Sequence, residues 1–249
     1  MKLKVFEAQQ SLANFAAQHI RNRAEQAIGN WGQFSLVLAG GKTPELAYQR
    51  LATLNNIDWS RVHLFWGDER MVPHTHPDSN YGMVERSLLS HVAIPAANVH
   101  AIETAGMTPD SAAKNYSRTI STYFDSVPET DGLFDLVLLG LGDDGHTASL
   151  FPAMPSLKES DRYCVGTPPG RLPPPVDRVT MTFPLLNSAR DVCFMVSGES
   201  KSETLREVLE GPTDVSFLPA QGIHLSDGEI HWYVDTSAAS ALCKVYPSD

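Results

Sequence analysis

The feature that most constrains the fold is a series of short apolar runs, each followed by a glycine-rich or charged segment and then by an amphipathic stretch. Three of these runs, Phe34–Ala39, Val62–Trp66 and Phe134–Leu139, are continuous enough to be strands buried on both faces. The stretches between the runs have helical periodicity. Strands that alternate with helices predict an α/β fold with a mostly parallel, Rossmann-like sheet and helices on both of its faces.

The remaining elements follow from the same patterns. Further strands are expected at Lys2–Phe6, near Val99–Ile102, and at Arg178–Phe183, Asp191–Val196 and Ile230–Val234. Helices are expected over Ala8–Ile28, from Pro44 through about Leu54, and over Tyr81–Leu89, Pro109–Phe124 and Glu199–Leu209. Thr43 is the expected N-cap of the second helix, with Pro44 at its first position. The proline-rich stretch Pro168–Pro175 is interpreted as a rigid surface loop, so residues 1–249 are predicted to form a single domain.

Composition and charge exclude several classes of protein. The net charge of −10, without any run of Lys and Arg, argues against a nucleic acid partner. No apolar run approaches the roughly 18 residues that a membrane span needs, and Met1–Gln10 does not have the pattern of a signal peptide. Cys164, Cys193 and Cys243 are too widely spaced for a zinc knuckle or a disulfide framework. A reducing, cytoplasmic location is therefore expected.

Four segments that follow predicted strands carry glycines together with charged residues. They are Gly40–Pro44 (GGKTP), Gly67–Arg70 (GDER), Gly140–His146 (GLGDDGH) and Ser197–Lys201 (SGESK). In an open parallel sheet, ligands bind outside the carboxyl ends of the strands. If the four strands are neighbours, these segments should therefore surround one site.

The segment Gly40–Pro44 is a strand–turn–helix junction, where backbone N–H groups and a helix N-terminus favour an anion. It is not a Walker A motif, and a plain turn remains an alternative at this point. The Thr43 hydroxyl is a further donor to such an anion. Arg70, Arg178 and Lys201 are candidate cations, and an arginine binds phosphate or carboxylate in a bidentate manner.

His146 is the candidate for proton transfer, because an imidazole is matched to acid–base chemistry near neutral pH. Asp144 lies two residues before it and is placed to fix its tautomer and orientation. The structural alternative is a capping aspartate followed by a turn histidine. Asp68 follows another strand, where its carboxylate is suited to binding sugar hydroxyls or to supporting a base.

Three other motifs are weaker. The residues GLGDDG match the G-x-G-x-x-G pattern of dinucleotide-binding folds, but Asp143 and Asp144 would stand where the pyrophosphate lies, and Pro152 leaves little room for the required helix. His74 and His76, in the loop PHTHPD, have only a carboxylate nearby, which is a weak metal signature. No serine lies in the nucleophile-elbow pattern, so a serine hydrolase is not proposed.

With these residues identified, the chain resembles the 6-phosphogluconolactonases, a family related in fold to the glucosamine-6-phosphate deaminases. The resemblance covers almost the whole chain. It runs through SLVLAGGKTPELAYQRLA, FWGDERMVPHTHPDSNYGM, FDLVLLGLGDDGHTASLFP, RVTMTFPLLNSARDVCFMVSGESKSETL and the late Pro219-Ala220-Gln221. Its most specific parts are Asp78-Ser79-Asn80-Tyr81-Gly82 and GLGDDGHTASLFP.

The resemblance implies hydrolysis of 6-phosphogluconolactone in the oxidative pentose phosphate pathway. It implies that His146 is the general base that activates water and that Asp144 supports it. It also assigns a substrate-binding role to eight residues. Gly40, Gly41, Lys42 and Thr43 would line the sugar-phosphate site, Arg178 and Lys201 would neutralise the phosphate, and Asp68 and Arg70 would line the sugar pocket. The partner is then a phosphorylated sugar lactone, with no metal or organic cofactor; the sequence does not address protein partners.

Two departures from family patterns bear on this assignment. The deaminases place a glutamate five residues after the corresponding histidine, where this chain has Phe151. Lys42 stands where many lactonases carry a small polar residue. The alternatives left open are an amino-sugar-phosphate deaminase or isomerase, against which Phe151 argues, and a non-enzymatic sugar-phosphate sensor, for which no DNA-binding segment is visible.

Overall fold

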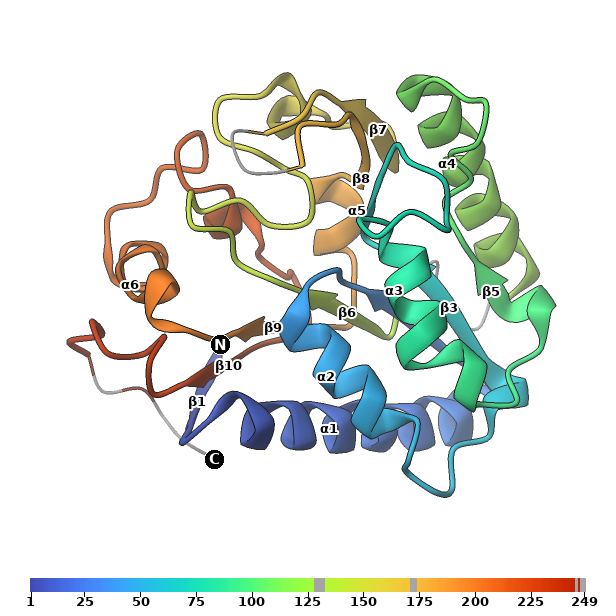
Figure 1. The fold of residues 1–249 in the computed structure, drawn as a ribbon, viewed down its shortest axis with the longest axis horizontal. Helices are drawn as coiled ribbons and strands as arrows, with labels where there is room; N and C mark the ends of the chain where they lie inside the picture. The colour runs from blue at the N-terminus through green and yellow to red at the C-terminus, as the bar shows by residue number, and fades with distance from the viewer. Residues whose placement is uncertain (128–132, 171–173, 245, 247–249) are drawn as a thin grey trace.

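A seven-stranded parallel sheet forms the centre of the computed structural model, which describes residues 1–127, 133–170, 174–244 and 246 (Figure 1). The strand order is β1-β10-β9-β6-β2-β3-β5, and each neighbouring pair is parallel. The strands are β1 (Lys2–Phe6), β2 (Phe34–Leu38), β3 (Val62–Trp66), β5 (Val99–His100), β6 (Leu136–Leu139), β9 (Asp191–Val196) and β10 (Glu229–Asp235). The predicted α/β class with a mostly parallel sheet is confirmed.

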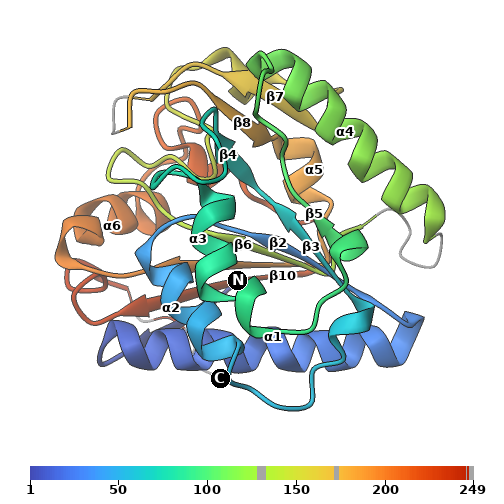
Figure 2. The same cartoon turned by 45° about the vertical axis from the view of Figure 1, so that its right-hand side comes forward.

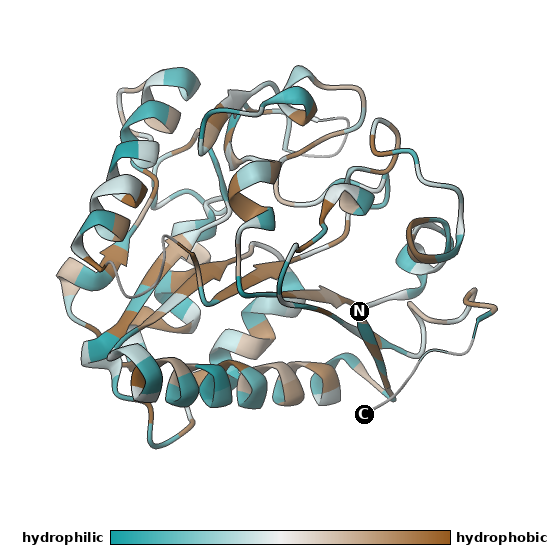
Figure 3. Ribbon diagram, turned by 180° about the vertical axis from the view of Figure 1, so that it is seen from behind, coloured by the Kyte–Doolittle hydropathy of each residue, from teal (hydrophilic) through white to brown (hydrophobic). Residues whose placement is uncertain are grey.

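Helices cover both faces of this sheet (Figures 1 and 2). They are α1 (Gln9–Trp31), α2 (Lys42–Leu51), α3 (Asn80–Ser87), α4 (Pro109–Ser126), α5 (Phe183–Asn187) and α6 (Ser202–Glu210). Helices α1 and α2 pack together on one side of the sheet, and α4 and α5 lie on the other. Apolar residues concentrate in the central strands and on the inward faces of the helices (Figure 3), as burial of the core requires.

A second, antiparallel sheet was not expected from the sequence. It contains β4 (Asp68–Arg70), β8 (Arg178–Met181) and β7 (Cys164–Thr167), in the order β4-β8-β7. The predicted strand at Arg178–Phe183 therefore belongs to this sheet, and Asp68–Arg70 is a strand and not a charged turn. Gly67 joins the two sheets, because its N–H donates to Leu38 O while its carbonyl accepts from Met181 N. The consequence for the site is that Arg70 lies directly opposite Arg178.

The start of α2 corrects a prediction. The N-cap is Gly41 and not Thr43, so the helix begins at Lys42 and Pro44 is its third residue, within the first turn. Gly41 has φ of +105°, a conformation open to glycine, and this turns the chain into the helix earlier than a threonine cap would. The expected loop Pro168–Pro175 includes residues 171–173, which lie outside the described residues.

Four neighbouring strands carry the segments that the sequence singled out. β9, β6, β2 and β3 are consecutive in the sheet, so SGESK, GLGDDGH, GGKTP and GDER all emerge at the same edge. This confirms the expectation that the segments lie together. The chain leads from β2 to β3 on one side and from β6 to β9 on the other, so a topological switch point lies between β2 and β6. Ligands usually bind at such a point in open α/β sheets. In the described part of the chain, no helix is long and apolar enough to cross a membrane.

The histidine pair beside β5 makes stability depend on pH. The ring of His100 stacks on Phe65 at 4.4 Å, and its Nε2 lies 3.2 Å from His63 Nδ1. Burial, with the neighbouring His63, lowers the pKa of His100 from 6.5 to about 4, so the unfolded chain binds this proton more tightly. We expect the free energy of unfolding to decrease as pH falls from about 6.5 to 4. The decrease should be less steep in His100→Phe, and urea unfolding at several pH values measures both. The same slope in His100→Phe as in an exposed-site control, His91→Phe, would contradict this.

Candidate active site

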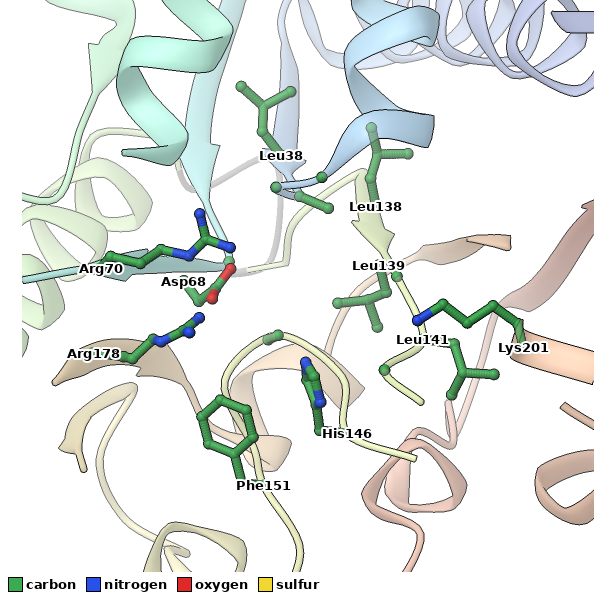
Figure 4. A pocket seen from close by; sticks show the side chains of 17 residues that line it. Leu38, Asp68, Arg70, Leu138, Leu139, Leu141, His146, Phe151, Arg178 and Lys201 are labelled. Carbon is green, nitrogen blue, oxygen red and sulfur yellow. The ribbon is translucent and has the colours of Figure 1, made fainter. Parts of the chain in front are cut away.

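A cavity of about 230 Å³ opens at the carboxyl ends of the central strands (Figure 4). This is small beside the roughly 300–1,000 Å³ of most ligand pockets and suits one phosphorylated sugar better than a dinucleotide. Its floor is apolar and its polar groups come from different elements. The lining residues are Leu38–Gly41, Gly67, Asp68, Arg70, Leu138–Gly142, His146, Ala148, Phe151, Arg178 and Lys201.

His146 presents its ring to this cavity from the turn that follows β6 (Figure 4). Its Nδ1 lies 2.5 Å from Asp144 Oδ1, and the same oxygen accepts from the His146 backbone N–H at 3.2 Å. Burial opposes ionisation of Asp144, but the bonds and charge of His146 outweigh it and hold the pKa of this carboxyl below its usual value. An ionised Asp144 favours the tautomer with the proton on Nδ1, in which Nε2 is a proton acceptor.

The glycines of GLGDDGH have local steric roles. A Cβ on Gly142 would lie 2.0 Å from His146 Nδ1, so the imidazole packs where only hydrogen fits. Gly145 has φ of +81° and turns the chain back towards His146. From Gly140 to Met154 the chain forms turns and no helix, so the helix that a dinucleotide-binding motif needs is missing there.

Gly142→Ala is expected to displace the His146 ring and lower kcat by about a hundredfold, the lower end of what a positioned base contributes, while KM changes little. Steady-state kinetics on the lactone would measure both constants. The matched control is Gly29→Ala on α1, outside the cavity, because a Cβ there has no atom within 4 Å either. Equal losses in the two variants would contradict the steric role of Gly142.

Two arginines face each other across β4 and β8 at one side of the cavity (Figure 4). Arg70 Nη1 donates to Asp78 O at 2.6 Å, and the Arg178 guanidinium stacks 5.5 Å from the centre of the Phe151 ring. Among the described residues, neither Nε has a hydrogen-bond partner, although both are buried. Burial lowers the pKa of Arg178, the charge of Arg70 lowers it further, and the acidic residues Asp68, Glu69 and Asp78 offset part of this. Two adjacent, partly unsatisfied cations favour a bound anion.

Lys201 reaches the cavity from the other side, from the segment after β9 (Figure 4). Its Nζ lies 2.5 Å from Asp143 Oδ1, and Asp143 is half exposed. From the sequence, Asp143 was expected only to occupy the place of a pyrophosphate. In the structure the Asp143 carboxylate holds the Lys201 ammonium group at the rim of the cavity, where it can bind an anion.

Two residues without a predicted role, Ser149 and Asn80, fix the Asp68 carboxylate by hydrogen bonds. Its Oδ2 accepts from Ser149 Oγ at 2.5 Å, and its Oδ1 accepts from Asn80 Nδ2 at 3.2 Å. A Cβ on Gly40 would lie 2.0 Å from the Asn80 amide oxygen, so Gly40 allows this approach. Asn80 and Ser149 lie within the two most specific motifs of the family resemblance, and no other sequence feature pointed to a role for them in the site. The carboxylate is thus held at the cavity wall beside the two arginines.

Glu69 and two residues of GGKTP do not line the cavity. The Glu69 carboxylate accepts hydrogen bonds from the N-terminal turn of α3, including Asn80 N at 2.7 Å and Tyr81 N at 2.8 Å, and thereby holds that helix. Lys42 is exposed at the start of α2. Thr43 Oγ1 accepts from Gln9 Nε2 at 3.0 Å. Gly40 and Gly41 do line the cavity.

The chemistry of the cavity follows from what surrounds His146. Among the described lining residues there is no serine, threonine or cysteine. The nucleophile that an imidazole at this place can activate is therefore water. Phe151 packs on the His146 ring at 4.7 Å and makes that wall apolar, where the deaminases would carry a carboxylate. The arrangement is suited to the attack of water on an anionic substrate.

Comparisons with known proteins agree with this geometry. Residues 7–232 match the family model described as glucosamine-6-phosphate isomerases/6-phosphogluconolactonase. The chain is 42% identical to the 6-phosphogluconolactonase of Synechocystis over 224 residues, which cover 90% of each chain. Among solved structures, the 6-phosphogluconolactonase from Thermotoga maritima superposes with a TM-score of 0.82 at 32% identity, covering 94% of this chain and 99% of that one. The enzyme from Trypanosoma brucei has a TM-score of 0.83 at 28% identity, with 97% and 98% covered.

Proposed function

The chain belongs to the family of glucosamine-6-phosphate isomerases and 6-phosphogluconolactonases, and we propose that it hydrolyses 6-phosphogluconolactone with a water molecule that His146 activates. The product is 6-phosphogluconate, an intermediate of the oxidative pentose phosphate pathway. The observation that carries the proposal is the position of His146, whose Nδ1 is bound by Asp144 while the ring faces a cavity lined by cations.

The reaction proceeds in two proton transfers. His146 Nε2 takes a proton from water as the oxygen attacks C1 of the lactone, and Asp144 stabilises the imidazolium that forms. The tetrahedral intermediate then collapses, the bond between C1 and the ring oxygen breaks, and the ring oxygen receives the proton from His146. Water has been added and both residues regain their starting state. Because a lactone is an activated ester, a base and good orientation suffice without a covalent intermediate.

Arg178 and Lys201 neutralise the substrate phosphate in this proposal. Arg178 has a buried, unsatisfied Nε, and Lys201 stands on the opposite side of His146 (Figure 4). Gly40 and Gly41 line the same cavity and lead into α2, whose first backbone N–H groups have no partner within the helix. In this proposal Lys42 and Thr43 contribute through these N–H groups. The Thr43 hydroxyl is bound to Gln9, and Lys42 is exposed and does not line the cavity.

Asp68 and Arg70 hold the sugar. The Asp68 carboxylate, fixed by Ser149 and Asn80, is an acceptor for sugar hydroxyls, and Arg70 stands beside it. The reaction belongs to the cytoplasm in this proposal. Free thiols at Cys164, Cys193 and Cys243 support a reducing location.

The wild-type protein is expected to release acid from freshly prepared 6-phosphogluconolactone well above the spontaneous rate, because the base and the phosphate site are already in place. Proton release in a weakly buffered solution measures this. Glucosamine-6-phosphate should yield no ammonia, since Phe151 replaces the ring-opening carboxylate. Ammonia release without lactone hydrolysis would favour the deaminase hypothesis. Binding of 6-phosphogluconate without any turnover would favour the sensor hypothesis.

A further inference from the structure

Three side chains with metal-binding atoms gather at the end of the sheet opposite the active site. Asp191 is the first residue of β9, and Glu229 and His231 lie at the start of β10. One ligand atom from each of these three lies within 4.8 Å of the others. His19, on α1, lies beside His231, with ring centroids 4.9 Å apart and tilted ring planes. None of these residues takes part in the proposed hydrolysis.

The two carboxylates are oriented in the same way. The outer oxygen of each is held by a basic residue, Asp191 Oδ2 by Arg23 and Glu229 Oε1 by Lys2. The inner oxygens, Asp191 Oδ1 and Glu229 Oε2, face His231 Nε2 at 3.9 Å and 3.7 Å. These distances are too long for hydrogen bonds. They are close to the separation of about 3.4 Å between ligand atoms that each lie about 2.0–2.1 Å from one tetrahedral ion.

His19 borders the three ligands from its place on α1. Its Nδ1 lies 3.0 Å from the Tyr233 hydroxyl, and its Nε2 is buried without a hydrogen-bond partner among the described residues. Asp191 and His231 are both more than nine-tenths buried, whereas Glu229 is exposed and leaves a route for an ion.

We propose that His231, Asp191 and Glu229 form a structural site for Zn²⁺ that ties the starts of β9 and β10 together, with a water molecule in the fourth position. An imidazole beside two carboxylates favours zinc over the harder ions calcium and magnesium, which prefer an all-oxygen shell. Because β1 is the last strand at its side of the sheet and Lys2 holds Glu229, the ion would secure an edge that otherwise relies on one strand pairing. The site acts on stability and not on catalysis.

Calorimetric titration of the chelator-treated full chain with ZnCl₂ tests the site. We expect one Zn²⁺ per chain, an affinity at least tenfold weaker in His231→Gln, and no change in His76→Gln, which alters the exposed histidine of the loop PHTHPD. All variants carry Cys243→Ser to remove the one exposed thiol. Zinc should also raise the melting temperature of the parent protein but not that of His231→Gln.

A second ligand variant keeps the test decisive if His231→Gln does not fold. Glu229→Gln, at the exposed ligand, should weaken binding at least tenfold and should change the visible absorption of bound Co²⁺, which reports the ligand set. The rate of lactone hydrolysis should be the same with and without chelator, since the site lies at the other end of the sheet. The proposal would be overturned if the parent protein did not bind zinc, or if both ligand variants bound zinc with the affinity of the parent protein.

Discussion

His146→Ala is expected to lower kcat for lactone hydrolysis by about 10²–10⁴-fold, the usual contribution of a positioned general base, with little change in substrate affinity. The reason is that the ring faces the cavity while its Nδ1 is held 2.5 Å from Asp144 Oδ1, which leaves Nε2 to accept the proton of water. Proton release from fresh 6-phosphogluconolactone gives the rate. Binding of 6-phosphogluconate, measured by calorimetry, gives the affinity.

Two further variants separate catalysis from packing. His146→Gln keeps a side-chain N–H for Asp144 but cannot accept a proton, so it should be as inactive as the alanine variant while it melts near the wild-type temperature. His91→Ala, which removes an exposed histidine, should be fully active. If His146→Ala lost binding and kcat to the same degree, the residue would be a binding or packing group and not the base.

Arg178→Ala is expected to lower kcat/KM by about 10–100-fold, mostly through a higher KM. A hydrogen bond between charged groups is worth about 1.5–3 kcal/mol, and phosphate contacts persist from the ground state to the transition state. Arg178 is almost fully buried, and its Nε has no partner among the described residues, so the loss removes a desolvated cation from the cavity. Initial rates over a range of lactone concentrations measure both constants.

Arg178 also stacks on Phe151, so its removal alters packing as well as charge. Arg178→Lys keeps the charge without the planar, bidentate group and should fall between wild type and the alanine variant. The control is Arg206→Ala on α6, where the arginine forms an ion pair with Glu203 of its own helix. An unchanged KM in Arg178→Ala would exclude it from the phosphate site.

The central sheet was predictable because its strands carry their signal locally. Val62–Trp66 and Asp191–Val196 were predicted with the bounds that the structure has, since both are continuous apolar runs buried on both faces. The antiparallel sheet was missed for the opposite reason. Asp68–Arg70 is three charged residues, and Cys164–Thr167 is short, so their extended conformation depends on pairing with Arg178–Met181.

The candidate site shows the same division. His146 with Asp144, and the segments around Gly40 and Lys201, were identifiable because a ligand site at strand ends recruits glycines and charged residues in contiguous motifs. Ser149 and Asn80 were quoted within motifs but had no assigned role, because their partner Asp68 is 81 residues from one and 12 from the other. Sequence spacing carries no information on such contacts.

The sequence by itself determined the fold class, the strand ends at which the site lies and the candidate base, because hydrophobic periodicity and local turn chemistry act over a few residues. Only the tertiary structure decided that Arg70 faces Arg178, that Gly142 makes room for the His146 ring, and that Thr43 does not cap its helix. It also brought together His19, Asp191 and His231, which lie more than 200 residues apart at their extremes. These contacts are decided by sheet order and close packing, which depend on the whole chain at once.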